Sequence, residues 1–134
     1  MQHPQVVVFE RDGRLAEQLQ PLAAAERWPL RESRQDEPCL RWLRQAGVSV
    51  LVVKVSRDHP GRELALVERV GRLLPDVPVV VVGEPEDAAA MNGLAWDLGA
   101  AFALFAPLSR ELLPGVVHGL MRKAAEAVLP GGPP

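Results

Sequence analysis

Four short apolar runs recur along the chain, with room for one helix between neighbouring runs, and this alternation constrains the fold most. They cover residues 6–9, 48–53, 77–82 and 100–105. Each run is rich in Val, Ala or Phe and is bounded by Gly, Pro or charged residues, as buried parallel strands tend to be. A weaker segment, residues 28–32, contains a proline and alternating charges that predict an edge strand.

The segments between these runs have the period of amphipathic helices. The expected buried stripes are Leu15, Leu19 and Leu22; Leu40, Leu43 and Ala46; Leu64, Val67, Gly71 and Leu74; Met91, Leu94, Ala95 and Leu98; and Leu112, Val116, Leu120 and Ala124. Asp12 and Ser109 are placed to cap the first and last helices, and Pro114 should kink the last helix or loosen its first turn. Strict alternation predicts a parallel sheet with helices on both faces and right-handed crossovers.

Length and composition predict a single cytoplasmic domain. The 134 residues fit one domain of ordinary size, which we assign to residues 1–128, with a tail or linker at residues 129–134. The net charge of −2 argues against nucleic-acid binding by a basic surface. The lone Cys39 excludes an internal disulfide and suits a reducing compartment. No signal peptide is visible, and no apolar run approaches the roughly 20 residues that span a bilayer.

Several local segments resemble the receiver domain of bacterial response regulators, over residues 5–126. Residues 99–107, Gly-Ala-Ala-Phe-Ala-Leu-Phe-Ala-Pro, are similar to the family's Gly-Ala-Asp-Asp-Tyr-Leu-x-Lys-Pro. Residues 74–82 resemble the approach to the fourth strand, and residues 109–113 the start of the fifth helix. The resemblance implies a flavodoxin-like (βα)5 three-layer sandwich whose five-stranded parallel sheet has the order 2-1-3-4-5.

The residues that would carry the family's phosphotransfer are largely replaced. Receivers usually have two acids after the first strand that hold Mg²⁺, and this chain has Glu10 and Arg11 there. Lys54 stands where the family's phosphorylated aspartate follows the third strand. Gly83 and Ala106 replace the Thr or Ser after the fourth strand and the lysine before the strand-five proline. Only Glu10 keeps its charge.

These replacements predict a chain that is not an enzyme and is not phosphorylated in the family manner, with no cofactor and no metal. Phosphoryl transfer to a carboxylate needs the nucleophile, a divalent cation and a donor to the transferred oxygens. An ammonium at position 54 removes the first and repels the second. We expect Lys54 to pair with Glu10, with Glu84 and Asp12 as further candidates. Such a pair about balances its desolvation cost.

The function expected is therefore that of a non-phosphorylatable receiver-like module that acts by protein–protein interaction in bacterial two-component-type signalling. One alternative is a small-molecule-binding or enzymatic flavodoxin-like domain that uses the strand-end crevice. Another is a receiver phosphorylated at a displaced acid, Asp58 or Asp12. His59 lies beside Asp58, but one histidine among scattered acids matches no metal-ligand spacing. No glycine-rich phosphate loop follows the first strand.

The expected interaction surface lies around the fourth helix, the fifth strand and the fifth helix, through which the resemblance implies protein partners or a homodimer. Trp96, Phe105 and Leu108 are its candidate residues, with Phe102 nearby. Trp96 falls outside the stripe formed by Met91, Leu94 and Leu98, which predicts that it is exposed. One of the two phenylalanines is expected to fill the core instead. Trp42, between Arg41 and Arg44, is a second possible contact.

Overall fold

The computed structural model describes residues 4–45, 47–55, 60–83, 88–105 and 110–127. Five parallel strands form one sheet in the order β2-β1-β3-β4-β5, so the fold predicted from the sequence is confirmed. The strands are β1 (Gln5–Phe9), β2 (Leu30–Ser33), β3 (Ser49–Lys54), β4 (Val79–Val82) and β5 (Phe102–Leu104). The weak second strand is at one edge, as its proline and charges predict.

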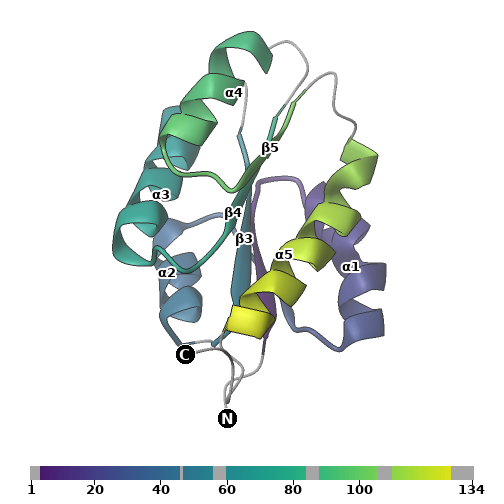
Figure 1. Ribbon diagram of the computed structural model, residues 1–134. Helices are drawn as coiled ribbons and strands as arrows, with labels where there is room; N and C mark the ends of the chain where they lie inside the picture. Colours follow the sequence, from purple (N-terminus) through teal and green to yellow (C-terminus); the bar gives the residue numbers. More distant parts are fainter. Residues whose placement is uncertain (1–3, 46, 56–59, 84–87, 106–109, 128–134) are drawn as a thin grey trace.

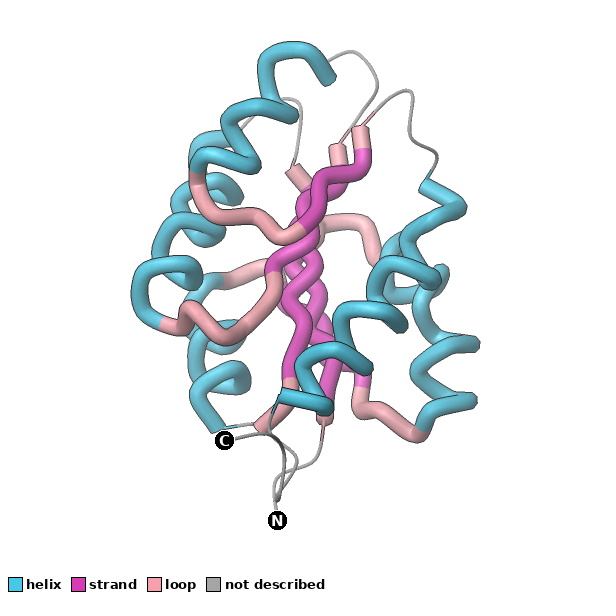
Figure 2. Tube along the Cα trace, in the orientation of Figure 1, coloured by secondary structure: helices cyan, strands magenta, loops and turns pink. Residues whose placement is uncertain are grey.

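Helices alternate with the strands and cover both faces of the sheet (Figures 1 and 2). They are α1 (Arg14–Glu26), α2 (Asp36–Gln45), α3 (Pro60–Leu73), α4 (Ala88–Asp97) and α5 (Leu113–Ala127), the last preceded by the 3-10 turn η2 (Arg110–Leu112). Helices α2, α3 and α4 pack on one face, and α1 and α5 on the other. Within the described residues, no helix is long and apolar enough to cross a membrane.

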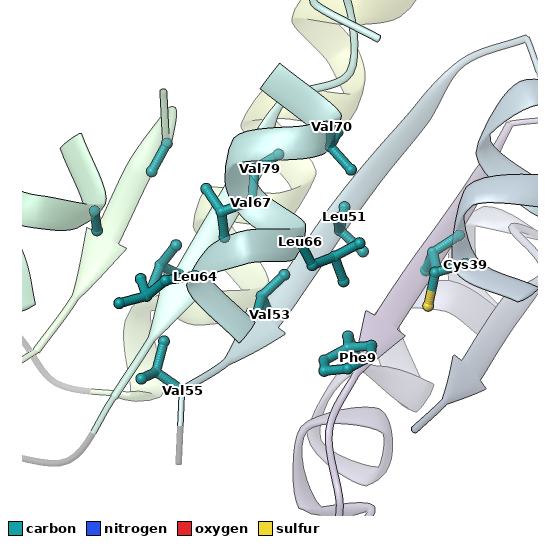
Figure 3. Packing of buried hydrophobic residues seen from close by; sticks show 14 of the residues in the cluster. Phe9, Cys39, Leu51, Val53, Val55, Leu64, Leu66, Val67, Val70 and Val79 are labelled. Carbon is teal, nitrogen blue, oxygen red and sulfur yellow. The ribbon is translucent and has the colours of Figure 1, made fainter. Parts of the chain in front are cut away.

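Because strand side chains alternate between faces, the sheet separates two apolar cores. One contains Leu51 and Val53 of β3 beneath α2, α3 and α4, and the other contains Val50 and Val52 beneath α1 and α5. Figure 3 shows part of the first core, where Leu66 of α3 lies against β3. The central strands β1 and β3 are buried on both faces, which explains their nearly continuous valine runs.

The last helix differs from its expected register. Leu112 is 48% exposed, and the residues that enter the core are Leu113, Val117 and Met121. Val116, Leu120 and Ala124 pack only partly buried beside them. Pro114 is the second residue of α5, where the amide hydrogen it lacks would have no helical partner, and the 3-10 turn ends at Leu112, before α5 begins at Leu113. Ser109, its predicted cap, is outside the described residues.

Helix α4 also departs from its predicted stripe. Leu94 is 41% exposed, whereas Ala95 is fully buried against the sheet. Gly71 of α3 allows a close approach here, because a Cβ at this position would lie 3.3 Å from the carbonyl oxygen of Leu98. The small residues Gly71 and Ala95 therefore set how closely α3, α4 and the sheet pack.

Candidate functional site at the carboxyl edge of the sheet

The carboxyl ends of the strands, at the top of Figure 1, bring three of the predicted site residues to one edge. The parallel register pairs Phe9 with Val53 and Lys54 with Val82. Glu10, directly after β1, Lys54, the last residue of β3, and Gly83, directly after β4, therefore share this edge. Arg11 is exposed to solvent. Ala106 lies outside the described residues.

Glu10 is turned into the protein and holds the beginning of α1. Its side chain is 2% exposed, and its two carboxylate oxygens each accept a hydrogen bond of 2.8 Å, Oε1 from the Leu15 amide and Oε2 from the Ala16 amide. A carboxylate at this point satisfies two helical N–H groups that have no helical acceptor and complements the helix dipole. Glu10 therefore performs the capping role that the sequence had assigned to Asp12.

Asp12 does not cap α1 in the predicted way. The N-cap residue is Gly13, whose left-handed backbone (φ 74°) favours glycine. Asp12 Oδ1 only accepts from the Arg14 amide at 3.2 Å, within the turn that leads into the helix.

Lys54 forms its ion pair with Asp12, not with Glu10 as expected first. Its Nζ lies 2.7 Å from Asp12 Oδ2, and the lysine side chain is only 13% exposed. The expected pairing with Glu10 was wrong because the Glu10 carboxylate is directed at the α1 amides. Glu84, another partner candidate, lies outside the described residues. The Lys54–Asp12 pair links the end of β3 to the loop that follows β1.

The pKa values of Glu10 and Asp12 are shifted in opposite directions. Burial raises the pKa of Glu10; hydrogen bonds from the α1 amides oppose the rise, and contacts with Glu32 and Asp12 add to it. The hydrogen bond from Lys54 lowers the pKa of Asp12 to about 2, against the smaller effect of burial. Asp12 is thus held as a carboxylate by the Lys54 ammonium, with the Arg14 Nε also 3.8 Å from its Oδ2.

Gly83 and Phe105 are in steric contact at the same edge. A Cβ built on Gly83 would lie 1.9 Å from Cε1 and 2.5 Å from Cδ1 of Phe105, so the ring fills the space of any side chain at position 83. Phe105 itself is 3% exposed and belongs to the core beneath α3 and α4. Its assignment to a possible interface was therefore wrong. Alternation along β5 directs Phe105 to the same face as Ala103.

The Mg²⁺ that the receiver resemblance implies does not fit this arrangement. Both oxygens of Glu10 accept helix amides, and an ammonium lies 2.7 Å from Asp12. Among the described residues, no group of three or more His, Cys, Asp and Glu side chains is arranged to hold a metal ion. One candidate for a displaced phosphoryl acceptor, Asp12, forms an ion pair with Lys54. The other candidate, Asp58, and the neighbouring His59 are outside the described part of the chain.

The exposed aromatic predicted on α4 is found. Trp96 is 46% exposed, and its ring centroid lies 6.1 Å from that of the partly buried Phe102 on the edge strand β5. Leu94, also exposed, lies two residues before it on α4. Leu108, the third interface candidate, is outside the described residues. Because residues two apart are about 200° apart around a helix, Leu94 lies on a different side of α4 from Trp96. This part of the expected surface therefore has Trp96 and Phe102 as its described apolar members.

Comparison with solved structures gives the class of fold. The chain is similar to a response regulator from Thermotoga maritima (17% identity, 90% of this chain and 98% of that chain, TM-score 0.68). It is also similar to the signal receiver domain of an HD domain-containing protein from Pseudomonas fluorescens (14%, 95% and 93%, TM-score 0.72) and to the beryllofluoride-activated NtrC4 receiver domain dimer (15%, 90% and 98%, TM-score 0.71). No family model and no curated protein matches the sequence.

At these identities the likeness establishes the fold, which is that of response-regulator receiver domains. Against that fold, the edge of the sheet where receivers are phosphorylated has an ion pair between Lys54 and Asp12 and a core phenylalanine against Gly83.

Proposed function

We propose that this chain is a pseudo-receiver: a receiver-fold module that accepts no phosphoryl group and acts through fixed protein-binding surfaces in bacterial two-component-type signalling. The observation that carries the proposal is the Lys54–Asp12 pair, 2.7 Å long and formed by a lysine that is 13% exposed. It occupies the carboxyl end of β3, where a receiver would need a carboxylate nucleophile. An ammonium does not attack as a carboxylate does, and its charge disfavours a divalent cation.

The contact between Gly83 and Phe105 supports the same proposal independently. A hydroxyl side chain after β4 would have no room while the Phe105 ring fills the adjacent space. The edge thus lacks both a carboxylate at the end of β3 and a hydroxyl after β4. Because the described residues of this edge supply neither group, we infer that the module does not read a phosphoryl group there and is not an enzyme.

The surface we propose for binding is the face formed by α4, β5 and α5. The α4 sequence, Ala-Ala-Ala-Met-Asn-Gly-Leu-Ala-Trp-Asp, contains one charged residue, Asp97. Trp96 is 46% exposed on it and lies beside Phe102 of the edge strand β5. Large half-exposed apolar side chains on a nearly uncharged helix are typical of protein interfaces. We propose a second copy of the chain as one partner of this face.

The test of the main proposal is direct phosphorylation. The full chain is incubated with acetyl phosphate and Mg²⁺ and then analysed by intact mass, with the Thermotoga maritima response regulator treated in parallel as a positive control. We expect no adduct on this chain while the control is modified. A single phosphoryl adduct would refute the proposal. Its loss in Asp12→Asn would assign the acceptor to Asp12, and its persistence would direct peptide mapping to Asp58.

A further inference from the structure

Positive charge is concentrated in the segment of the chain between residues 27 and 72. Residues 27–72 contain ten basic and six acidic side chains, whereas the rest of the chain contains five basic and eleven acidic ones. This segment contains the edge strand β2, helix α2, the central strand β3 and helix α3. A chain of net charge −2 therefore contains a basic segment, although no basic run is visible in its sequence.

Arg31 of the edge strand β2 is held in place by two contacts. Its guanidinium carbon lies 5.5 Å from the centroid of the Trp42 ring, within the range of a cation–π interaction. Its Nε donates to Gln5 Oε1 at 3.1 Å. Gln5 is 4% exposed and in turn donates to the Trp42 carbonyl at 2.8 Å and to Ser49 Oγ at 3.3 Å. A buried amide thus fixes an exposed arginine on a half-buried tryptophan.

Helix α2 has two further arginines in its carboxyl half. Arg41 and Arg44 are exposed, and their spacing of three residues makes them neighbours on the helix surface. Neither forms an ion pair with the part of the chain that the structure describes. By contrast, Arg62 and Arg69 of α3 lie 3.7 and 3.8 Å from Asp36 at the start of α2. The positive charge without an ion-pair partner among the described residues is therefore on the exposed side of α2, in its carboxyl half.

We propose that Arg31, Arg41, Arg44 and Trp42 form a docking surface for an acidic segment of a protein partner. Guanidinium groups bind carboxylates in bidentate geometry, and Arg and Trp are the side chains enriched at binding hot spots. Fixing Arg31 beforehand reduces the ordering cost of binding. Three arginines in a chain of pI about 5.9 favour a short acidic peptide over a polyphosphate backbone. This surface extends the proposed interaction role to a second face and names its partner chemistry.

The test uses the full chain and a fluorescein-labelled peptide rich in Glu and Asp with a central Leu. We expect ¹H–¹⁵N shifts confined to α2 and β2 and an affinity that falls with salt. The Arg41→Glu/Arg44→Glu variant should bind at least about tenfold more weakly, and Arg31→Gln should also weaken binding. Arg122→Glu, an exposed arginine on α5, is the matched control and should bind as the wild type does. Circular dichroism checks that each variant is folded.

Three results would overturn the proposal. The first is the absence of peptide binding by the wild type up to about 1 mM, which is the weak end of measurable affinity. The second is a loss of peptide affinity in Arg122→Glu equal to that in Arg41→Glu/Arg44→Glu. The third is tighter binding of oligo-uridine RNA or phosphatidylserine vesicles than of the peptide. None of them bears on the acetyl phosphate assay. Failure of this surface and failure of the pseudo-receiver proposal are therefore distinguishable.

Discussion

The Phe105 ring occupies the space into which any side chain at position 83 would project, with Cε1 only 1.9 Å from the place of a Cβ on Gly83. Gly83 follows β4 and Phe105 follows β5, so the contact joins neighbouring strands at their carboxyl ends. Because Phe105 is 3% exposed, its ring cannot give way into solvent. The large ring at position 105 and a hydroxyl side chain at position 83 therefore exclude each other sterically.

Gly83→Ala is expected to destabilise the chain by about 2 kcal/mol, because the added methyl forces the buried ring from its position. Phe105→Ala alone should cost about 3 kcal/mol through loss of a buried aromatic ring. In the Phe105→Ala background, however, Gly83→Ala should cost less than about 0.5 kcal/mol, since the clash is gone. Urea unfolding of the two single variants and the double variant measures this coupling.

Gly93→Ala is the control for this cycle. Gly93 lies inside α4, and a Cβ there would meet nothing within 4 Å. The substitution should therefore stabilise the chain slightly, by up to about 1 kcal/mol from helix propensity. Additive effects of Gly83→Ala and Phe105→Ala would contradict the steric contact.

Lys54→Met is expected to change stability at neutral pH by less than about 1 kcal/mol. The variant loses a pair whose acid is 42% exposed, and it gains an apolar side chain at a site that is 13% exposed. The pH dependence of this stability change is more diagnostic of the ion pair than its size at neutral pH. Because the folded pKa of Asp12 is about 2, below its ordinary 3.8, the stabilisation from the pair is complete above the ordinary value and lost as pH falls through about 2.

The difference in unfolding free energy between wild type and Lys54→Met should accordingly change between about pH 5 and about pH 2 and level off outside this range. Lys123→Met, which removes an exposed lysine of α5, is the matched control and should leave the acid limb of the profile unchanged. Parallel pH profiles for wild type and Lys54→Met would show that Lys54 does not lower the pKa of Asp12.

Glu10→Ala should destabilise the chain by about 2 kcal/mol, because it leaves the buried Leu15 amide and the Ala16 amide without acceptors at the start of α1. Glu10→Gln keeps one acceptor oxygen and should cost about half as much. Glu17→Ala, an exposed acid in the first turn of the same helix, should stay within about 0.5 kcal/mol of the wild type. Thermal unfolding of the three variants gives the order, and an equal effect of the Glu10 and Glu17 substitutions would argue against a capping role.

The fold could be predicted from the sequence because its signals are local. Valine runs such as that of β3 can be satisfied only where both faces of a strand are covered, and the helical stripes between them supply the cover. The proline in the segment before β2 likewise predicted that this strand lies at the edge of the sheet. Element boundaries were less predictable at α5, where Leu112 and Leu113 are adjacent apolar residues and only the 3-10 turn decides which of them is buried.

For the site, the sequence predicted which residues are present but not the contacts between them. The sequence indicated which residues follow each strand, but the partner of Lys54 depends on where the Glu10 carboxylate points, and that depends on the position of α1. The occupation of the space beside Gly83 was also hidden, because it requires the distance between β4 and β5. Phe105 is directed to the core by alternation, a signal that was present but did not decide between the two phenylalanines.

Trp96→Ala should keep the chain monomeric if the α4–β5–α5 face forms the proposed dimer. Trp96 is 46% exposed, and its ring lies 6.1 Å from that of Phe102 at an interplanar angle of 58°, so its removal takes away a large apolar group of this face without opening the core. Light scattering across a concentration series should show the wild-type mass rising from the 14.6 kDa of one chain toward twice that value, while Trp96→Ala stays at one chain.

Leu73→Ala provides the matched control for this experiment. Leu73 is also 46% exposed, but it lies at the end of α3, outside the proposed face. Loss of a comparable apolar side chain there should leave dimerisation intact, since hot-spot residues act through their place in an interface and not through hydrophobicity alone. Dimerisation weakened equally by both substitutions would indicate non-specific association, and a wild type that stays monomeric at every concentration would exclude the homodimer and leave this face to a different protein partner.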